Sequence, residues 1–199
     1  MNNIIGTDIS SIKEIGDNNT IINCKFVGDD ILIGNNCTIK NSVIAGGTII
    51  TDSYIEGGLI GEKCSIGPYS RIRATTNIGN NCKIGNFVEI KNSTLGNGVK
   101  CSHLSYVGDA IIGDNTNIGC GVVFANYDGK SKHISMVGKN CFVGSNVNII
   151  APIKIADDTF ICAGTTVTAD TQAGDFVIGR VRAESKEKYK YYLKNRQKN

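Results

Sequence analysis

An aliphatic residue followed by glycine recurs along this chain, and most gaps between copies are six residues or a multiple of six. Equivalent positions return after eighteen residues, as from Ile60 to Ile78 and from Ile66 to Ile84. A period of six fits neither an α-helix nor an alternating strand. It fits a coil with three flat faces, in which each aliphatic residue points inward and stacks on its copy one coil away. The repeat therefore predicts an all-β solenoid.

The hexapeptide pattern is typical of the left-handed parallel β-helix. Gly and Asn follow the inward residues, as in Gly34-Asn35-Asn36 and Gly79-Asn80-Asn81, and both tolerate strained turn conformations. The left-handedness departs from the usual right-handed crossover rule and rests on the pattern, not on sterics. We expect a lead-in over residues 1–15, one β-helix domain of roughly eight coils over 16–179, and a basic arm over 180–199.

The positive charge of the chain is concentrated at its C-terminal end. Residues 180–199 hold eight Lys or Arg against two Glu, a charge of +6, while the whole chain carries +3, so residues 1–179 carry −3 by subtraction. The lack of Gly and Pro from Glu184 to Asn195 predicts a short helix there. The simplest interpretation is a solvated terminal helix, and the alternative is a lid that attracts a phosphorylated cofactor. Nucleic-acid binding is not expected, because no reading motif accompanies the charge.

The eight cysteines indicate the compartment. Cys37, Cys64, Cys82 and Cys141 each precede an inward aliphatic residue by two, and from Cys64 onward successive cysteines lie about one coil apart. We interpret them as stacked small side chains, not as a disulfide or metal framework. Unpaired thiols favour the cytoplasm. No run is long and apolar enough to cross a membrane, and the N-terminus lacks a signal-peptide layout.

One stretch breaks the six-residue rhythm. Nineteen residues separate Ile118 from Val137, and the segment near residues 125–136 is polar. A solenoid can extrude a loop without disturbing the neighbouring coils, and loops carry function more often than scaffolds do. We therefore predict an extruded loop near 125–136 that takes part in a functional site.

An ordered set of motifs goes beyond the bare repeat, which many acyltransferases share. The motifs are Ile66-Gly-Pro-Tyr-Ser-Arg-Ile-Arg73, Ile84-Gly-Asn-Phe-Val-Glu-Ile-Lys91, His103-Leu-Ser-Tyr-Val-Gly-Asp109, Asn117-Ile-Gly119, Asn126-Tyr-Asp-Gly129, Val143-Gly-Ser145, Ala151-Pro152 and Ile178-Gly-Arg180. On these motifs, the chain from about Gly16 to Arg182 resembles the acetyltransferase domain of the bifunctional N-acetylglucosamine-1-phosphate uridyltransferase/glucosamine-1-phosphate N-acetyltransferase family.

The resemblance implies a role for each position that matches a family motif. It implies acetyl-CoA as the co-substrate, the amine of glucosamine 1-phosphate as the acceptor, and His103 as the general base. The residues expected to bind the acceptor are Arg73, Lys91, Tyr106, Asn117 and Lys132. The residues expected to bind acetyl-CoA are Cys120, Asn126, Tyr127, Ser145, Ala163 and Arg180. The family is trimeric with sites between subunits, so a homotrimer is expected, serving the synthesis of UDP-N-acetylglucosamine and cell-envelope precursors.

These residue types suit the implied chemistry. An amine must lose a proton to attack a thioester, and an imidazole can accept that proton near neutral pH. A backbone N–H in the turn Gly119-Cys120-Gly121 can stabilise the oxyanion, and Cys120 keeps that N–H although the family usually has Ala there. A phosphomonoester needs cations, which Arg73, Lys91 and Lys132 supply. Neither a covalent acyl-enzyme nor a metal is required.

Three neighbours of these residues carry weaker expectations. Arg71 and Arg73 are expected to alternate, so that only one of them faces the site, and the resemblance favours Arg73. Glu89 is expected to point the same way as Lys91, either orienting it or simply pairing with it. His133 is expected to be an ordinary loop residue.

Other interpretations stay open. An acetyltransferase for a different amino sugar would keep the fold and His103 but need not keep the three cations. In a non-catalytic trimerisation scaffold, no function would require the residues found at the site positions. A β-helix carbonic anhydrase needs three His ligands for zinc, and this chain has two. The family's nucleotidyltransferase domain has no counterpart here, so no uridyltransferase activity is expected. The chain is then either an excised domain or a stand-alone enzyme that passes its product to a separate uridyltransferase.

Overall fold

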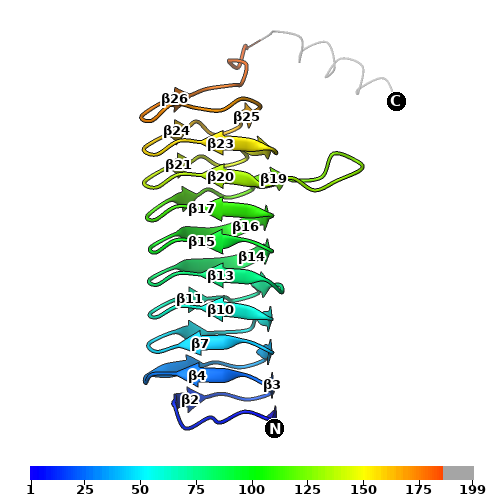
Figure 1. Ribbon diagram of the computed structural model, residues 1–199, viewed down its shortest axis with the longest axis vertical. Coiled ribbons are helices and arrows are strands. Elements are labelled where there is room, and N and C mark those ends of the chain that lie inside the picture. The colour runs from blue at the N-terminus through cyan, green and yellow to red at the C-terminus, as the bar shows by residue number, and fades with distance from the viewer. Residues whose placement is uncertain (186–199) are drawn as a thin grey trace, which may run out of the picture.

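The computed structural model describes residues 1–185. In this part of the chain, short strands form three parallel ladders that stack into one elongated prism, with the first and last described residues at opposite ends (Figure 1). The stack has about 10 turns. The predicted fold class, a left-handed parallel β-helix, is confirmed.

Each coil contributes one strand to each of three faces. The first face comprises β2 (Ile12–Ile15), β5 (Ile31–Ile33), β8 (Ile49–Ile50), β11 (Ser65–Ile66), β18 (Asn117–Ile118), β21 (Phe142–Val143), β24 (Phe160–Ile161) and β26 (Phe176–Val177). The second face comprises β1 (Asn3–Ile5), β3 (Thr20–Ile22), β6 (Thr38–Lys40), β9 (Tyr54–Glu56), β12 (Arg71–Ile72), β19 (Val123–Ala125), β22 (Asn148–Ile150) and β25 (Thr166–Val167). The third face comprises β4 (Lys25–Val27), β7 (Val43–Ala45), β10 (Gly58–Ile60), β13 (Thr76–Ile78), β15 (Thr94–Leu95), β17 (Ala110–Ile112), β20 (Ser135–Val137) and β23 (Ile153–Ile155).

Two strands differ from the rest because they run through a corner without a break. β14 (Lys83–Lys91) and β16 (Lys100–Gly108) each have nine residues, and both belong to the first and the second face. They pair with each other in parallel along most of their length. The corner between the first two faces is therefore more extended at this height of the prism than in the other coils.

The prediction of roughly eight coils was too low. β1 and β2 lie within the predicted lead-in, yet they pair in parallel with β3 and β5. The ladder of strands thus begins at Asn3, although the register between β2 and β5 shifts between Ile12 and Glu14. This irregularity hid the first coils from the repeat pattern. The domain boundaries at residues 16 and 180 stay predictions.

The core is a stack of aliphatic side chains from successive coils. Ile66 pairs with Ile84, and Val143 pairs with Ile161, as the eighteen-residue spacing predicted. These four side chains are at most 1% exposed. Burying such a side chain contributes about 1.5–3 kcal/mol. A slip of one residue would turn every inward side chain outward, so the core also fixes the register of the coils.

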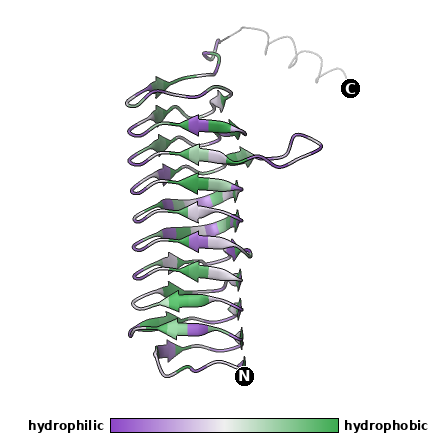
Figure 2. Cartoon of the chain, in the orientation of Figure 1, coloured by the Kyte–Doolittle hydropathy of each residue, from purple (hydrophilic) through white to green (hydrophobic). Residues whose placement is uncertain are grey.

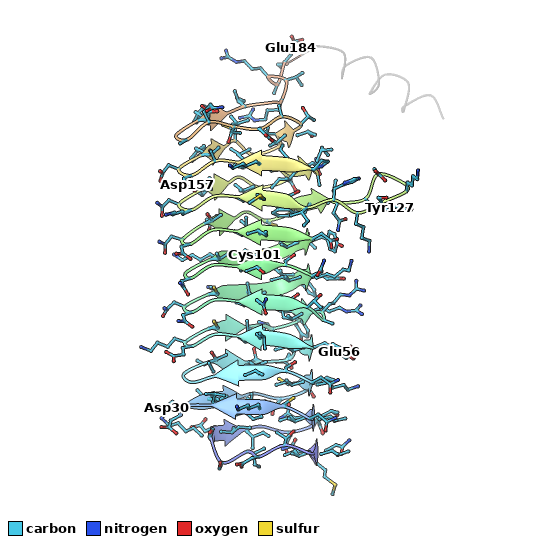
Figure 3. All side chains as sticks on the ribbon, viewed as in Figure 1. Asp30, Glu56, Cys101, Tyr127, Asp157 and Glu184 are labelled. Atoms are coloured by element: carbon cyan, nitrogen blue, oxygen red, sulfur yellow. The ribbon has the colours of Figure 1, made fainter. Side chains whose placement is uncertain are left out.

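The cysteines follow the same packing. Seven of the eight are buried with free thiols, and Cys120 is exposed. Cys101, for example, lies within the stack, whereas Tyr127 lies on the protruding loop (Figure 3). Burial raises the pKa of Cys101 to about 12, so this thiol stays protonated. The seven buried cysteines are small core side chains, as predicted, whereas the prediction was wrong for Cys120, which stands two residues after the inward Ile118 and points outward.

A polar loop leaves the prism between β19 and β20, where the sequence predicted an extruded segment near 125–136. It stands away from the coils, and its residues are largely hydrophilic (Figures 1 and 2). The helix predicted from Glu184 to Asn195 falls almost entirely on residues 186–199, outside the described residues. Over residues 1–185, the structure contains no helix with the length and hydrophobicity needed to cross a membrane.

Candidate active site

The strands β14 and β16 carry most of the predicted site. In their ladder, Asn86 pairs with His103 at the corner, and Glu89 pairs with Tyr106 on the second face. His103 is exposed. Because β16 continues through the corner, one rigid strand presents both the predicted base and the predicted sugar contact. An active site on strands is held more precisely than one on loops.

Three cations that the resemblance assigns to the acceptor, Arg73, Lys91 and Lys132, gather beside the second face. The Arg73 N–H donates to the Ile90 carbonyl at 2.9 Å, which places Arg73 one coil from Lys91. Lys132 comes from the extruded loop and touches Lys91, and this contact lowers the pKa of Lys132. The pKa of Lys91 is raised, first by the contact with Lys132 and further by the charge of Asp109. Amines this close to each other and to Arg73 can bind an anion between them.

Two carboxylates offset part of this charge. Glu89 Oε1 lies 2.9 Å from Arg73 Nη1, and Asp109 Oδ2 lies 3.6 Å from Lys91 Nζ. The expectation that Glu89 would orient or pair with Lys91 was therefore wrong. Its ion pair runs across the ladder to the next coil instead of along its own strand.

The expectation that Arg71 and Arg73 would face opposite ways was also wrong. Residues two apart in a strand share a face, and both flank Ile72, which is fully buried. Both arginines therefore point outward. Arg71 lies over the ring of Tyr54, 6.0 Å from its centroid, and Arg73 joins the ion pair with Glu89. Arg73 remains the arginine of the cation cluster.

The predicted base and three predicted acetyl-CoA residues form one column along the prism. Each stands two residues after a paired inward residue of the first face, so they occupy the same corner on successive coils: His103, Cys120, Ser145 and Ala163. Backbone bonds tie the column together, since Cys120 O accepts from Asn146 N and Ser145 O accepts from Gly164 N, both at 2.8 Å. The side chain of Arg180 lies against Gly164, at the upper end of the column.

Bulky side chains occupy this corner in three consecutive coils. Tyr69, Phe87 and Leu104 have φ of 58°, 58° and 38°, a left-handed region that other coils give to Asn or Gly, as at Asn146 and Gly121. All three are more than half exposed, and the rings of Tyr69 and Phe87 stack at 5.6 Å. Such conformations cost about 1–3 kcal/mol each and cluster at functional sites. The sequence reasoning missed them, although the lack of Asn or Gly at this position was a readable signal.

A hollow extends from the corner onto the second face. It has a volume of about 450 Å³ and is lined by Phe87, Glu89, Leu104, Ser105, Tyr106, Gly121 and Val123. It therefore lies between the residue that follows His103 and the strand that ends at Lys91. Another hollow, on the third face, is lined by residues such as Ile111, Met136 and Lys154, and none of its lining residues is a predicted site residue.

The extruded loop is anchored next to the second face. Asn126 is buried, and its side-chain amide donates to Asp109 Oδ2 at 2.5 Å and to Tyr106 OH at 3.4 Å. Tyr127 is 60% exposed and bridges to Lys132 across the loop. The His133 Nε2 lies 2.6 Å from Asp128 Oδ2, so His133 helps to shape the loop.

Asn117 lies apart from the other predicted acceptor residues. It is on β18 of the first face, in register with Lys100 and Phe142. The cation cluster and Tyr106 are on the second face, on the other side of the corner. Within one chain, the structure therefore brings together Arg73, Lys91, Tyr106 and Lys132, but not Asn117.

Comparison with known proteins gives the class of this β-helix. The family model of the GMPPB C-terminal domain matches residues 70–173, more than half of the chain, and the chain belongs to this family. A solved UDP-N-acetylglucosamine acyltransferase of Francisella novicida gives a TM-score of 0.47 at 22% identity, covering 72% of this chain and 58% of that one.

Two curated relatives of the chain are both named bifunctional protein GlmU. The chain is 48% identical over 161 residues to the bifunctional protein GlmU of Clostridioides difficile (strain 630), covering 81% of this chain and 35% of that protein. It is 40% identical over 183 residues to GlmU of Clostridium novyi (strain NT), covering 91% of this chain and 40% of that protein. The chain thus spans a little more than a third of the length of these relatives. The resemblance inferred from the motifs is confirmed.

Proposed function

We propose that this chain transfers the acetyl group of acetyl-CoA to the amine of glucosamine 1-phosphate, giving N-acetylglucosamine 1-phosphate and CoA. The single observation that carries the proposal is that β14 and β16 run through one corner, with His103 exposed at that corner and Arg73, Lys91 and Lys132 gathered beside the adjoining second face. A base beside an anion site suits an acceptor that has an amine and a phosphate on one sugar ring. The relatives and the motif resemblance support the same reaction.

His103 would act as the general base in a direct transfer. The acceptor amine, with a pKa of about 7.7–8.0 if it resembles an α-amino group, gives its proton to the imidazole as the nitrogen bonds to the thioester carbon. The C–S bond then breaks, and the CoA thiolate leaves and takes up the proton from the His103 imidazolium, which restores the base. No acyl-enzyme forms, and no metal takes part.

The turn after β18 would stabilise the oxyanion of the intermediate. The amides of Gly119 and Gly121 donate to the carbonyls of Val143 and Leu104 at 2.8 and 2.7 Å. Among residues 1–185, this leaves the Cys120 N–H as the amide of the turn without a backbone acceptor. A free N–H one coil above His103 is suited to a developing negative charge. Cys120 would then act through its backbone, which tolerates the change from Ala.

A homotrimer would complete the site. Asn117 lies on the first face, across the corner from the chain's own cation cluster, so a neighbouring chain could place its first face opposite this chain's second face. The trimeric family supports this arrangement, and unpaired thiols support a cytoplasmic location. Native mass spectrometry of the purified chain should give the mass of three copies, and a monomer that is fully active would contradict the proposal.

Replacing Lys91 by Met is expected to lower kcat/KM for glucosamine 1-phosphate roughly 10- to 100-fold, because one charge-assisted hydrogen bond to phosphate contributes about 1.5–3 kcal/mol. Acetylation of glucosamine, which has no phosphate, should change little. Lys25→Met on the third face is the matched control. Equal losses with both acceptors would show that Lys91 does not recognise phosphate.

The proposal itself is tested by mass spectrometry of the sugar product. The chain is incubated with acetyl-CoA and glucosamine 1-phosphate, and the expected product is heavier than the acceptor by one acetyl group. No product would contradict the proposal, and glucosamine and nucleotide-linked amino sugars would then be tried as acceptors. A thiol dye is a poor readout, because the chain has eight cysteines.

A further inference from the structure

Asp109 is a buried acid that the proposed reaction does not use. It directly follows β16, has a left-handed φ of 51°, and its side chain is 8% exposed. A carboxylate buried to this extent is costly unless hydrogen bonds and a counter-charge compensate it. The hydrogen-bond partners of Asp109 therefore indicate which parts of the protein it fixes in place.

The carboxylate of Asp109 joins the substrate strand to the loop. Oδ1 accepts a hydrogen bond from Asn92 Nδ2 and Oδ2 accepts one from Asn126 Nδ2, both at 2.5 Å, while Lys91 Nζ lies 3.6 Å from Oδ2. Burial alone would raise the pKa of Asp109. The hydrogen bond from Asn92 and the charge of Lys91 outweigh burial and hold this pKa below its usual value, so the group is ionised.

The backbone of Asp109 makes a second set of contacts with the same elements. Its N–H donates to the Lys91 carbonyl at 3.0 Å, and its carbonyl accepts from Ser135 N at 3.1 Å. Asn126 begins the loop and Ser135 follows its end, so Asp109 binds both ends of the loop. The loop is also closed by a bond between its own two ends, since His133 N donates to the Asn126 carbonyl at 2.8 Å.

We propose that Asp109 is a positioning residue, which fixes the extruded loop so that Lys132 stands beside Lys91 and completes a cation site for the acceptor phosphate. The identity of that anion rests on the proposed function, whereas the fixing of the loop does not. Asp109 acts through Lys91, Asn126 and the loop backbone, and it touches no reacting atom.

Asp109→Asn separates this role from simple charge balance. Asparagine keeps the shape but carries no charge, and its amide nitrogen cannot accept a hydrogen bond from either Asn92 or Asn126. If Asp109 positions the loop, KM for glucosamine 1-phosphate rises about tenfold while kcat changes less than twofold. If it only offsets the charge of Lys91, the cluster becomes more positive and KM falls. A fall in KM would overturn the proposal.

A double-mutant cycle with Lys132 gives the sharper test. In the native background Lys132→Met raises the acceptor KM, whereas in the Asp109→Asn background it should change KM less than twofold, because the lysine is already misplaced. If the rise in KM of the double variant equals the product of the rises in the two single variants, the proposal is overturned. Asp157→Asn is the matched control, since Asp157 Oδ1 accepts from Lys139 N at 3.0 Å at a different corner. This control should leave both KM and the Lys132 effect unchanged.

Hydrogen exchange provides a readout that does not depend on activity. The amides of Ser131 and His133 are hydrogen-bonded in the loop, and both should exchange at least tenfold faster in Asp109→Asn, while β14 and β16 keep their protection. If Asp109→Asn fails to fold, Asn126→Ala removes only the loop-side partner and should give the same faster exchange. Unchanged exchange in the loop would overturn the proposal. If the native chain acetylates nothing, the proposed function fails, and this exchange measurement still decides the role of Asp109.

Discussion

Replacing His103 by alanine is expected to lower kcat for acetyl transfer to glucosamine 1-phosphate by roughly 10²- to 10⁴-fold, the usual contribution of a positioned general base. The side chain is exposed at the corner, so the melting temperature should stay within about a degree of the native value. Single-turnover kinetics with saturating acetyl-CoA and acceptor measures the effect, because this separates chemistry from substrate binding.

The control for this variant is His133→Gln, which changes the chain's other histidine. His133 contacts Asp128 within the loop that presents Lys132, so any loss there should appear in the acceptor KM and not in kcat. Equal kcat for His103→Ala and the native chain would leave the transferase in place but remove His103 as its base. A large loss of kcat in His133→Gln would also contradict the assignment.

Replacing Phe124 by alanine is expected to destabilise the fold by about 3–5 kcal/mol, the range for truncating a large buried aromatic side chain. Phe124 is fully buried in β19, just before the extruded loop leaves the prism. Urea unfolding followed by circular dichroism measures the change. The loss arises from buried area and from the cavity left beside Ile149, with which Phe124 is in register.

Phe176→Ala is the matched control for this core variant. Phe176 is 68% exposed at the end of the stack formed with Phe160, where the rings lie 5.3 Å apart. Removing it should cost no more than about 1 kcal/mol, the worth of one aromatic contact. If the two variants lost the same free energy of unfolding, this would contradict the placement of Phe124 in the core and of Phe176 on the surface.

The repeat predicted the scaffold because each inward residue must stack on its copy. Ile60 and Ile78, eighteen residues apart, are paired in the third face, and Ile66 and Ile84 are paired in the first. The same periodicity placed Cys82 in the core and showed where the loop breaks the pattern. The cation cluster could be predicted only through the motif resemblance, since spacing alone does not bring Lys132 to Lys91.

The other contacts of the site could not be predicted from the six-residue period, because the period does not specify which side chains meet across neighbouring coils. Glu89 pairs with Arg73 in the neighbouring coil because side-chain length and rotamer decide between partners across a ladder. Asp109 contacts Asn126 and Ser135 at the two ends of the loop, and both lie more than fifteen residues later in the sequence. Asn117 has the expected position in the repeat but lies on another face, and a single chain leaves it apart from the cluster.

The most direct test of the proposed function is a competition between two acceptors in one vessel. Equal concentrations of glucosamine 1-phosphate and glucosamine are mixed with limiting acetyl-CoA, and the two products are counted by mass spectrometry, so their ratio gives the ratio of kcat/KM. If the base and the cation cluster act together on one acceptor, the phosphorylated product should exceed the other at least about tenfold. Equal amounts of the two products, or an excess of N-acetylglucosamine, would contradict a phosphosugar acetyltransferase.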